Sequence, residues 1–201
     1  MDLEKKMLFA FAFLLLFLLF RQQSTIHYPL KVGNYWLYNG TLITENQAIF
    51  GNYSIKVDSI RNVDNKIYFL IKDSSDFLTY LYPVGNNIFL IEEVEDGVSY
   101  KYDPPMLLYS FALSNWEWKG KRGTASCTNN GHFVSIVSFQ NYFGTYTSFP
   151  IQNFLKCDDG FVKVTTAFFR EDIGISEYSG TLQRPQQNIS FLIHLYDYKI
   201  G

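Results

Sequence analysis

The sequence predicts an all-β fold, in which a curved antiparallel sheet (a half-barrel or an open barrel) lies behind an N-terminal hydrophobic helix. Aromatic residues make up 18% of the 201 residues, and charged residues only 18%. Aromatic and β-branched side chains are favoured on the pleated, half-buried surfaces of strands. Behind Arg21, turn signals recur roughly every ten residues, which is typical of sandwiches, barrels and curved sheets. No amphipathic helix pattern is found there.

The N-terminus combines positive charge with an apolar run. Lys5 and Lys6 precede residues 7–20, which are apolar without interruption and are followed by Arg21. This order is the pattern of a secretory signal. A helix of these 14 residues rises about 21 Å, which is less than the hydrocarbon core of a bilayer, about 30 Å.

Two fates of this segment are open. No small-residue cleavage site and no lipid-accepting cysteine follow Phe20. Residues 1–24 are therefore predicted to be either a signal peptide or an N-terminal anchor in the cytoplasmic membrane. In both cases the lysines favour a cytoplasmic N-terminus. Residues 25–201 are then expected outside the cytoplasm, as a single β-domain of the cell envelope or a secreted protein.

Alternating apolar and polar residues mark the strands behind this segment. Asp96 and Gly97, flanked by alternating patterns, are the strongest hairpin signal, because a type I′ turn needs positive φ at both central residues. The predicted strands cover residues 53–58, 66–72, 77–82, 88–95, 98–102, 116–121, 132–143, 149–156, 161–169, 173–182 and 189–200.

Two adjacent prolines interrupt the pattern. Proline has no backbone N–H to donate to a sheet ladder, so Pro104 and Pro105 cannot both sit inside a central strand. Residues 103–114 are therefore predicted to connect two meanders of strands. The apolar stretch 104–113 is a candidate for an internal plug or lid.

Two Trp-x-aromatic pairs stand directly behind turn signals. In a strand, residues two apart share a face, so Trp36 lies with Tyr38, and Trp116 lies with Trp118. We interpret the two pairs as core residues in the first strands of the two meanders. The alternative is an exposed aromatic platform for sugars or other ring-bearing ligands.

The two cysteines fit an oxidising compartment. Cys127 and Cys157 are the only cysteines, and both lie in the exported part. An even pair in such a compartment predicts a disulfide. The alternative is a pair of buried free thiols. The three histidines have no zinc-ligand spacing, and no metal or other cofactor is predicted.

The stretch YPLKVGNYWLY resembles the start of a family of exported bacterial lipoproteins and wall-associated proteins. That family opens near Tyr/Phe-Pro-Leu-x-x-Gly-Asn-x-Trp-x-Tyr. LSNWEWKG, FPIQNFLKC and AFFREDIGISEYSG resemble its later strands. The resemblance implies a curved antiparallel sheet, like the half-barrels that carry lipids or lipoproteins in the envelope. It implies no catalytic residues, and the family's lipid-bearing cysteine is absent here.

Charged residues give no catalytic pattern. The net charge of −2 provides no basic stripe for nucleic acid. His194 is interpreted as an ordinary strand residue. Two acidic clusters fall at predicted hairpin turns, where solvated charges are common. The clusters are Glu92, Glu93, Glu95 and Asp96, and then Asp158 and Asp159.

The sequence thus predicts a non-catalytic extracytoplasmic envelope domain. It would bind a lipid-like ligand or an envelope protein in the concave face of its sheet, and would contact the membrane through its N-terminal segment. The alternative is a structural accessory domain that assembles through a sheet edge. An enzyme is the third choice. A carrier should leave inward apolar positions unfilled, whereas a structural domain should be packed solid.

Overall fold

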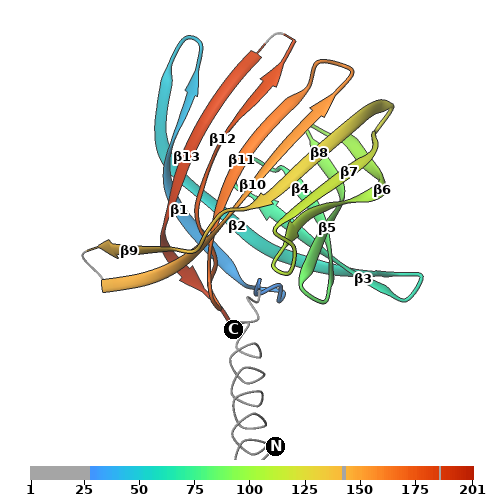
Figure 1. Ribbon diagram of the computed structural model, residues 1–201. Coiled ribbons are helices and arrows are strands. Elements are labelled where there is room, and N and C mark those ends of the chain that lie inside the picture. The colour runs from blue at the N-terminus through green and yellow to red at the C-terminus, as the bar shows by residue number, and fades with distance from the viewer. Residues whose placement is uncertain (1–27, 142–143, 186) are drawn as a thin grey trace, which may run out of the picture.

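The computed structural model describes residues 28–141, 144–185 and 187–201, which form strands and no helix (Figure 1). The predicted N-terminal helix lies outside these residues. The strands are β1 Tyr35–Thr44, β2 Ala48–Val63, β3 Lys66–Asp73, β4 Leu78–Val84, β5 Asn87–Glu95, β6 Val98–Ser110, β7 Asn115–Arg122, β8 Ala125–Phe133, β9 Val137–Asn141, β10 Gly144–Cys157, β11 Val162–Arg170, β12 Gly174–Arg184 and β13 Gln187–Lys199.

The strands form an antiparallel meander that closes on itself. Each strand pairs with the next one along the chain, except that β8 pairs with β10 while β9 branches off β10. β13 then pairs with the whole of β1. The predicted all-β fold with a curved antiparallel sheet is confirmed. The sheet goes beyond a half-barrel or an open barrel, because the pairing of its first and last strands makes a closed barrel of twelve strands.

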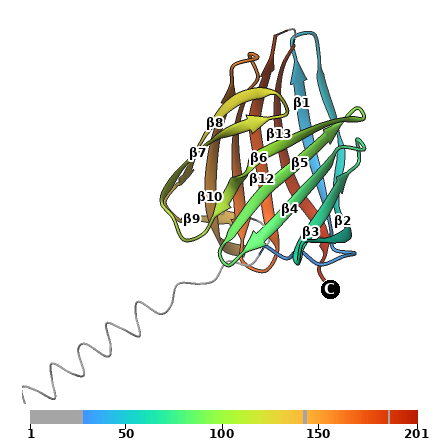
Figure 2. The same ribbon diagram turned by 90° about the vertical axis from the view of Figure 1, so that its right-hand side faces the viewer.

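The barrel has two different ends. At one end, here called the base, the chain enters through residues 28–34 and the C-terminus lies (Figures 1 and 2). The opposite end, here called the mouth, carries the β1–β2, β5–β6 and β12–β13 turns. Asp96 and Gly97 have φ of 50° and 77° in the β5–β6 turn, so the predicted hairpin is confirmed.

The two adjacent prolines lie inside a strand, contrary to the prediction. Pro104 and Pro105 belong to β6, and the bond before Pro104 is cis. The register between β5 and β6 shifts at this point, so that the ladder skips residues 102–105. The prolines therefore need no N–H for the ladder with β5. Most of the candidate plug, residues 104–113, is barrel wall.

One predicted strand is wrong and one strand was not predicted. Residues 132–143 do not form one strand, because β8 ends at Phe133 and β9 begins at Val137. β8 itself covers a stretch of small and polar residues without clear alternation. Its inward positions include Ala125 and Asn129, which are buried.

The first Trp-x-aromatic pair connects β1 to the start of β12. Trp36 and Tyr38 are each 1% exposed. The Trp36 indole Nε1 donates to the Ile173 carbonyl at 2.5 Å, and the Tyr38 hydroxyl donates to the Ile175 carbonyl at 2.9 Å. The ladder between β12 and β13 stops at Glu177, so both carbonyls lie beyond its end.

The second pair connects β7 to β6. These strands share only two ladder pairs near the mouth. Towards the base, the Trp118 indole donates to the Pro104 carbonyl at 2.9 Å, and the Trp116 indole donates to the Leu107 carbonyl at 3.0 Å. Both rings are buried. Side-chain hydrogen bonds thus continue the wall where the backbone ladder is interrupted, and the rings form no exposed platform.

An aromatic cluster fills the base. Phe169 is fully buried and makes edge contacts with Tyr109 and Phe111, with ring centroids 4.8 and 5.0 Å apart. Tyr28 stacks on Trp36 at 5.9 Å and meets the same phenylalanine at 5.7 Å. The entering segment therefore closes this end of the barrel with its own side chain.

Cys127 and Cys157 form a disulfide, as predicted. The two residues are direct partners in the β8–β10 ladder, with their Cα atoms 4.1 Å apart. Both are buried. The bond joins neighbouring strands near the mouth, since Cys157 is the last residue of β10.

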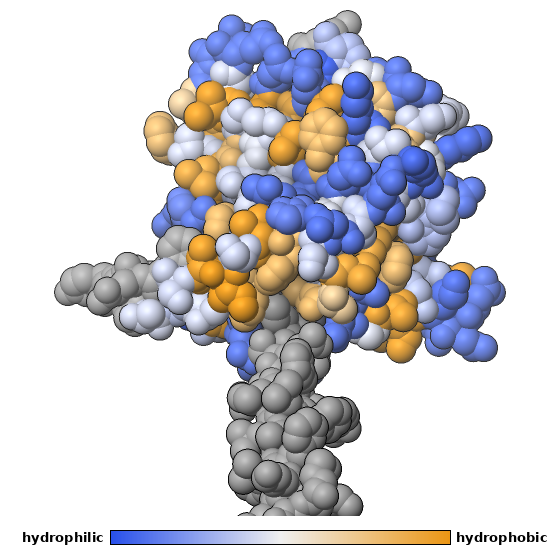
Figure 3. Space-filling view, viewed as in Figure 1, coloured by the Kyte–Doolittle hydropathy of each residue, from blue (hydrophilic) through white to orange (hydrophobic). Residues whose placement is uncertain are grey.

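Apolar side chains also lie on the outer face. Phe154 of β10, Val164 of β11, and Leu192 and Tyr196 of β13 are each more than one-third exposed. Figure 3 shows apolar patches that are separated by hydrophilic residues on the side drawn in Figure 1. This side of the barrel therefore has a mixed surface rather than one continuous apolar belt.

Removing the indole of Trp116 should destabilise the barrel in two steps. Trp116→Phe leaves the Leu107 carbonyl without this donor and should cost about 1 to 3 kcal/mol. Trp116→Ala also leaves a cavity and should cost about 3 to 5 kcal/mol. Urea unfolding measures both. Tyr196→Phe changes an exposed aromatic residue and should leave stability nearly unchanged. Equal stability of all three variants would contradict a core role.

Breaking the disulfide should lower stability substantially. Cys127 and Cys157 are separated by 30 residues, and closing a loop of that size contributes about 3 to 4 kcal/mol in the chain-entropy estimate. The double variant with alanine at both positions should lose that much in urea unfolding. A reducing agent should destabilise the natural protein and leave the double variant unaffected. Identical responses of the two proteins would contradict this.

Candidate functional site

The barrel contains a cavity of about 470 Å³. This volume lies within the range of small-molecule pockets, about 300 to 1,000 Å³. β1–β5 and β11–β13 supply most of the wall, β6 and β7 add a few residues, and β8 and β10 add none. The lining is mainly apolar and includes Leu42, Ile49, Ile55, Ile71, Leu81, Leu90, Leu182, Ile189, Phe191 and Ile193.

The small residue Gly51 and an open end contribute to this space. Gly40 and Gly51 are ladder partners in β1 and β2, and both line the cavity. A Cβ atom added to Gly51 would meet no atom within 4 Å. Leu42 and Ile49 lie on the cavity wall near the β1–β2 turn, yet they are 37% and 47% exposed. The cavity therefore opens to solvent at the mouth.

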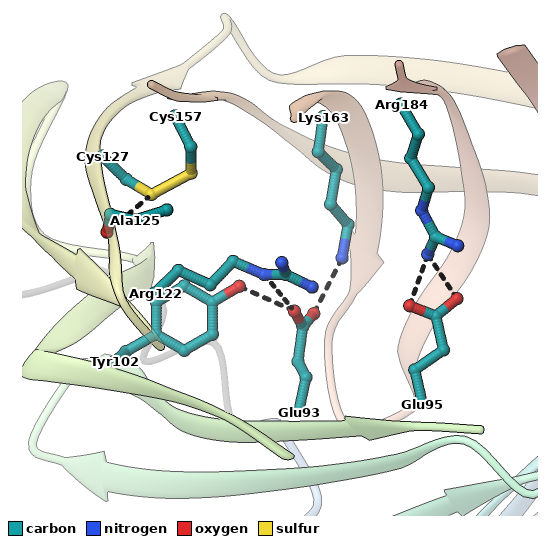
Figure 4. Close-up of polar contacts among 9 residues, drawn as sticks. All are labelled: Glu93, Glu95, Tyr102, Arg122, Ala125, Cys127, Cys157, Lys163 and Arg184. Carbon is teal, nitrogen blue, oxygen red and sulfur yellow. Dashed lines mark hydrogen bonds and ion pairs between the residues drawn. A yellow bond between two sulfur atoms is a disulfide. The ribbon is translucent and has the colours of Figure 1, made fainter. Parts of the chain in front are cut away.

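Two ion pairs cross the interior of the barrel (Figure 4). Lys163 of β11 donates to Glu93 of β5 at 2.9 Å, and Arg184 of β12 pairs with Glu95 of β5 through both carboxylate oxygens. In the closed ring, β5 lies opposite β11 and β12. The side chains can meet only if the barrel is flattened, so the ion pairs divide its interior into two parts.

The two parts are filled differently. On the side of β6, β7, β8 and β10, the interior is packed with buried side chains: Tyr102, Met106, Trp118, Ile151 and Leu155. On the other side, strands β12, β13 and β1–β4 surround the cavity. The barrel is thus half solid and half hollow, with the charged groups at the boundary.

Glu93 is the centre of the charged groups. It is 3% exposed, and the Tyr102 hydroxyl donates to its Oε2 at 2.6 Å. Burial by itself raises the pKa of the Glu93 carboxyl. Lys163, Tyr102 and Arg122 together outweigh that effect, so that the pKa lies below its ordinary value. Burial likewise lowers the pKa of Lys163, but the Glu93 carboxylate outweighs it and raises that pKa.

Arg122 is the second cation beside Glu93. Its side chain is 5% exposed, and its Nε lies 3.6 Å from the Glu93 carboxylate. The Nε has no hydrogen-bond partner. The guanidinium carbon lies 3.8 Å from the ring centroid of Tyr100 and 4.1 Å from that of Phe161. Two cations therefore share one carboxylate, and one of them is held in place mainly by aromatic rings.

The remaining acidic group of the cavity is fully engaged. Asp73 accepts hydrogen bonds from the Ser75 amide at 2.8 Å, the Ser75 hydroxyl at 2.7 Å and the Phe77 amide at 3.0 Å. The Tyr53 hydroxyl donates to its other oxygen. Burial and the nearby Asp73 raise the pKa of Tyr53. Asp73 therefore holds the β3–β4 turn and has a structural role.

The prediction of two solvated acidic clusters is wrong for Glu93, which is buried. A bulge explains the error: Leu90 and Glu92 of β5 pair with consecutive residues of β4, so Ile91 has no partner. The bulge turns Glu93 inward where strict alternation would turn Glu92 inward. In a strand with a bulge, two-residue alternation alone does not predict which side chains face inward. Glu92 instead accepts a hydrogen bond from exposed Ser99.

The other predicted polar residues lie away from the cavity. Asp158 accepts from the Ser126 amide and Asp159 from the Phe161 amide, so both stabilise the β10–β11 region. His194 is 56% exposed and pairs with Glu177 at 3.1 Å. Among the described residues, no three His, Cys, Asp or Glu side chains are grouped as metal ligands would be. The same residues include no helix that is long and apolar enough to cross a membrane.

Comparison with known proteins shows distant structural likeness. The sequence matches no protein-family profile and no curated protein. A protein described as a candidate lipoprotein of Parabacteroides distasonis is 10% identical, with a TM-score of 0.40, over 89% of this chain and 100% of that one. The hypothetical lipoprotein YmcC of Escherichia coli is 7% identical, with a TM-score of 0.38, over 79% and 86%.

A third solved structure is described as a candidate exported protein with a YmcC-like fold, from Bacteroides fragilis. It is 8% identical, with a TM-score of 0.36, over 87% of this chain and 99% of that one. Likeness at this level carries no argument about family or function. The family suggested by the YPLKVGNYWLY motif therefore stays a prediction.

Glu93→Gln should destabilise the protein most near neutral pH and least at acid pH. The pKa of Glu93 is lowered in the folded state from its ordinary 4.5. Its ionised form therefore contributes stability above that ordinary value, and the contribution is lost as the pH falls through the folded-state value. Near neutral pH, the loss of one partner of a buried ion pair should cost about 3 to 5 kcal/mol.

Thermal melts of the natural protein and this variant, taken from neutral to strongly acid pH, check the expectation. The two melting temperatures should converge as the pH falls. Glu92→Gln, which removes a carboxylate from the outer face of the same strand, is the matched control. A gap between Glu93→Gln and the natural protein that does not change with pH would contradict the role of the buried carboxylate.

Proposed function

We propose that this chain is a non-catalytic extracytoplasmic envelope domain that holds an apolar small molecule inside its barrel. The observation that carries the proposal is the cavity of about 470 Å³ with its mainly apolar lining. A carrier needs inward apolar positions that its own side chains leave unfilled. A purely structural domain would have filled this half of the barrel as it fills the other half.

The hollow half has features that favour a ligand. Leu42 and Ile49 present apolar surface at the mouth, where it contacts water. Apolar area that lines a concave site is typical of binding sites for small molecules. The closed ring leaves little edge for assembly, since β1 and β13 pair with each other and only β9 is an outer strand among the described residues. A structural domain that assembles through a sheet edge is thus less well supported.

Location outside the cytoplasm is part of the proposal. The two lysines and the apolar run of residues 7–20 have the order of an export signal. The Cys127–Cys157 disulfide suits an oxidising compartment, because such bonds are rare in the cytosol. Attachment to the membrane through residues 1–24 is proposed on the same pattern.

A non-catalytic role is proposed because the acidic groups at the cavity are engaged with other side chains. Asp73 holds a turn, and Glu93 and Glu95 are paired with cations. His194 lies outside the barrel beside Glu177. At the cavity, within residues 28–141, 144–185 and 187–201, these pairings leave no acidic group with the partner geometry of an acyl-transfer or hydrolytic site.

Filling the cavity should abolish binding of an apolar probe and spare the fold. Gly51→Trp places a large side chain where no atom lies within 4 Å of the added Cβ. The neutral dye N-phenylnaphthylamine should fluoresce with the natural protein and much less with the variant. The melting temperature of the variant should not fall, since the new ring fills a void.

Ala48→Trp is the matched control, because Ala48 is an exposed residue of the same strand and does not line the cavity. This variant should bind the dye as the natural protein does. Native mass spectrometry of protein recovered from the envelope should detect a bound small molecule. A natural protein that binds no dye and carries no small molecule would refute the carrier function.

A further inference from the structure

We infer that the ligand of the cavity is an anionic amphiphile, whose acidic headgroup binds Arg122 and Lys163 while its apolar chain fills the hollow half of the barrel. This inference rests on the proposed carrier function. The headgroup chemistry is that of a carboxylate or phosphate oxygen, which two basic side chains can bind by charge-assisted hydrogen bonds.

The charge balance at the cavity wall is the first argument. Glu93 is one carboxylate shared by Lys163 and Arg122, so this group carries one positive charge in excess. Buried charges are normally paired, because an unpaired charge in an apolar environment is costly. The other charges of the cavity do not supply the missing anion. Glu95 is paired with Arg184, and Asp73 lies at the β3–β4 turn, where it accepts hydrogen bonds from Ser75 and Phe77 and contacts neither Arg122 nor Lys163.

The unused hydrogen-bonding capacity of Arg122 is the second argument. Its Nε is buried without a hydrogen-bond partner, although its side chain lines the cavity. The guanidinium carbon lies 3.8 Å from the ring centroid of Tyr100 and 4.1 Å from that of Phe161. A guanidinium binds acidic oxygens through the N–H groups along its edge, and the buried Nε is one of these groups.

The position of these cations fixes the orientation of the ligand. Arg122 is the last residue of β7 and Lys163 the second residue of β11, so both lie near the mouth. Deeper in the cavity, towards the base, the wall includes Ile55, Tyr109 and Ile175. The headgroup therefore stays near solvent, and the chain points towards the aromatic cluster at the base.

The experiment compares a charged probe with an uncharged one on the same protein. cis-Parinaric acid is a fluorescent fatty acid, and its methyl ester has the same chain without the charge. The natural protein should bind the acid about 10- to 100-fold more tightly than the ester, which corresponds to one charge-assisted hydrogen bond. Inorganic phosphate alone, an anion without a chain, should not displace the acid.

Arg122→Met should reduce affinity for the acid about tenfold or more and leave affinity for the ester unchanged, which also shows that the variant is folded. Arg61→Met is the matched control, because Arg61 also lies over an aromatic ring but does not line the cavity.

Equal binding of acid and ester by the natural protein would overturn the inference and keep the carrier function. Displacement by phosphate alone would overturn it in favour of a free-anion site. Failure of both probes to bind would refute the carrier function itself.

Discussion

The number of strands in the closed ring determines how wide the barrel is, and therefore how much interior volume its side chains have to fill. A barrel of about eight strands is just wide enough for its own side chains to fill, and larger barrels enclose a cavity or a channel. Here twelve strands close through β1 and β13. Large aromatic rings fill the base and one half of the interior, but they do not fill the other half. The cavity follows from the ring size together with Gly51 of β2, beside which no atom lies within 4 Å of an added Cβ.

The width of the barrel also explains why charged groups lie in its interior. Two apolar walls that face each other across a wide barrel have no directional interaction that holds them at one distance. The pairs Glu93–Lys163 and Glu95–Arg184 join β5 to β11 and β12 directly. Such buried pairs add little net stability compared with apolar packing, but they can specify one arrangement. Here they specify a flattened barrel and keep a boundary between the packed half and the hollow half.

Part of this structure could be predicted from the sequence, and the rest depends on contacts between distant residues. Alternation and turn signals predict the hairpins and the inward direction of Trp36 and Trp118. They fail for β8, whose inward positions include small and polar residues. At one of these, Gly131, the β7 indole of Trp116 occupies the space: an added Cβ would lie 1.8 Å from its ring. They also fail at Glu93, which a bulge turns inward. Ring closure and the cavity require pairing across the whole chain, which no local pattern encodes.

The hollow half lowers the stability of the folded barrel, and the packed half must offset that loss. Unfilled volume removes dispersion contacts and lowers stability, as cavity-creating substitutions demonstrate. In this barrel the disulfide and the indole hydrogen bonds of Trp116 and Trp118 lie on β6, β7, β8 and β10, in the packed half. A bound amphiphile would restore the missing contacts and would stabilise the folded state in proportion to its concentration. Under the proposed carrier function, stability and occupancy of the cavity would therefore be linked, since the half of the barrel that gives up packing is the half that a ligand would complete.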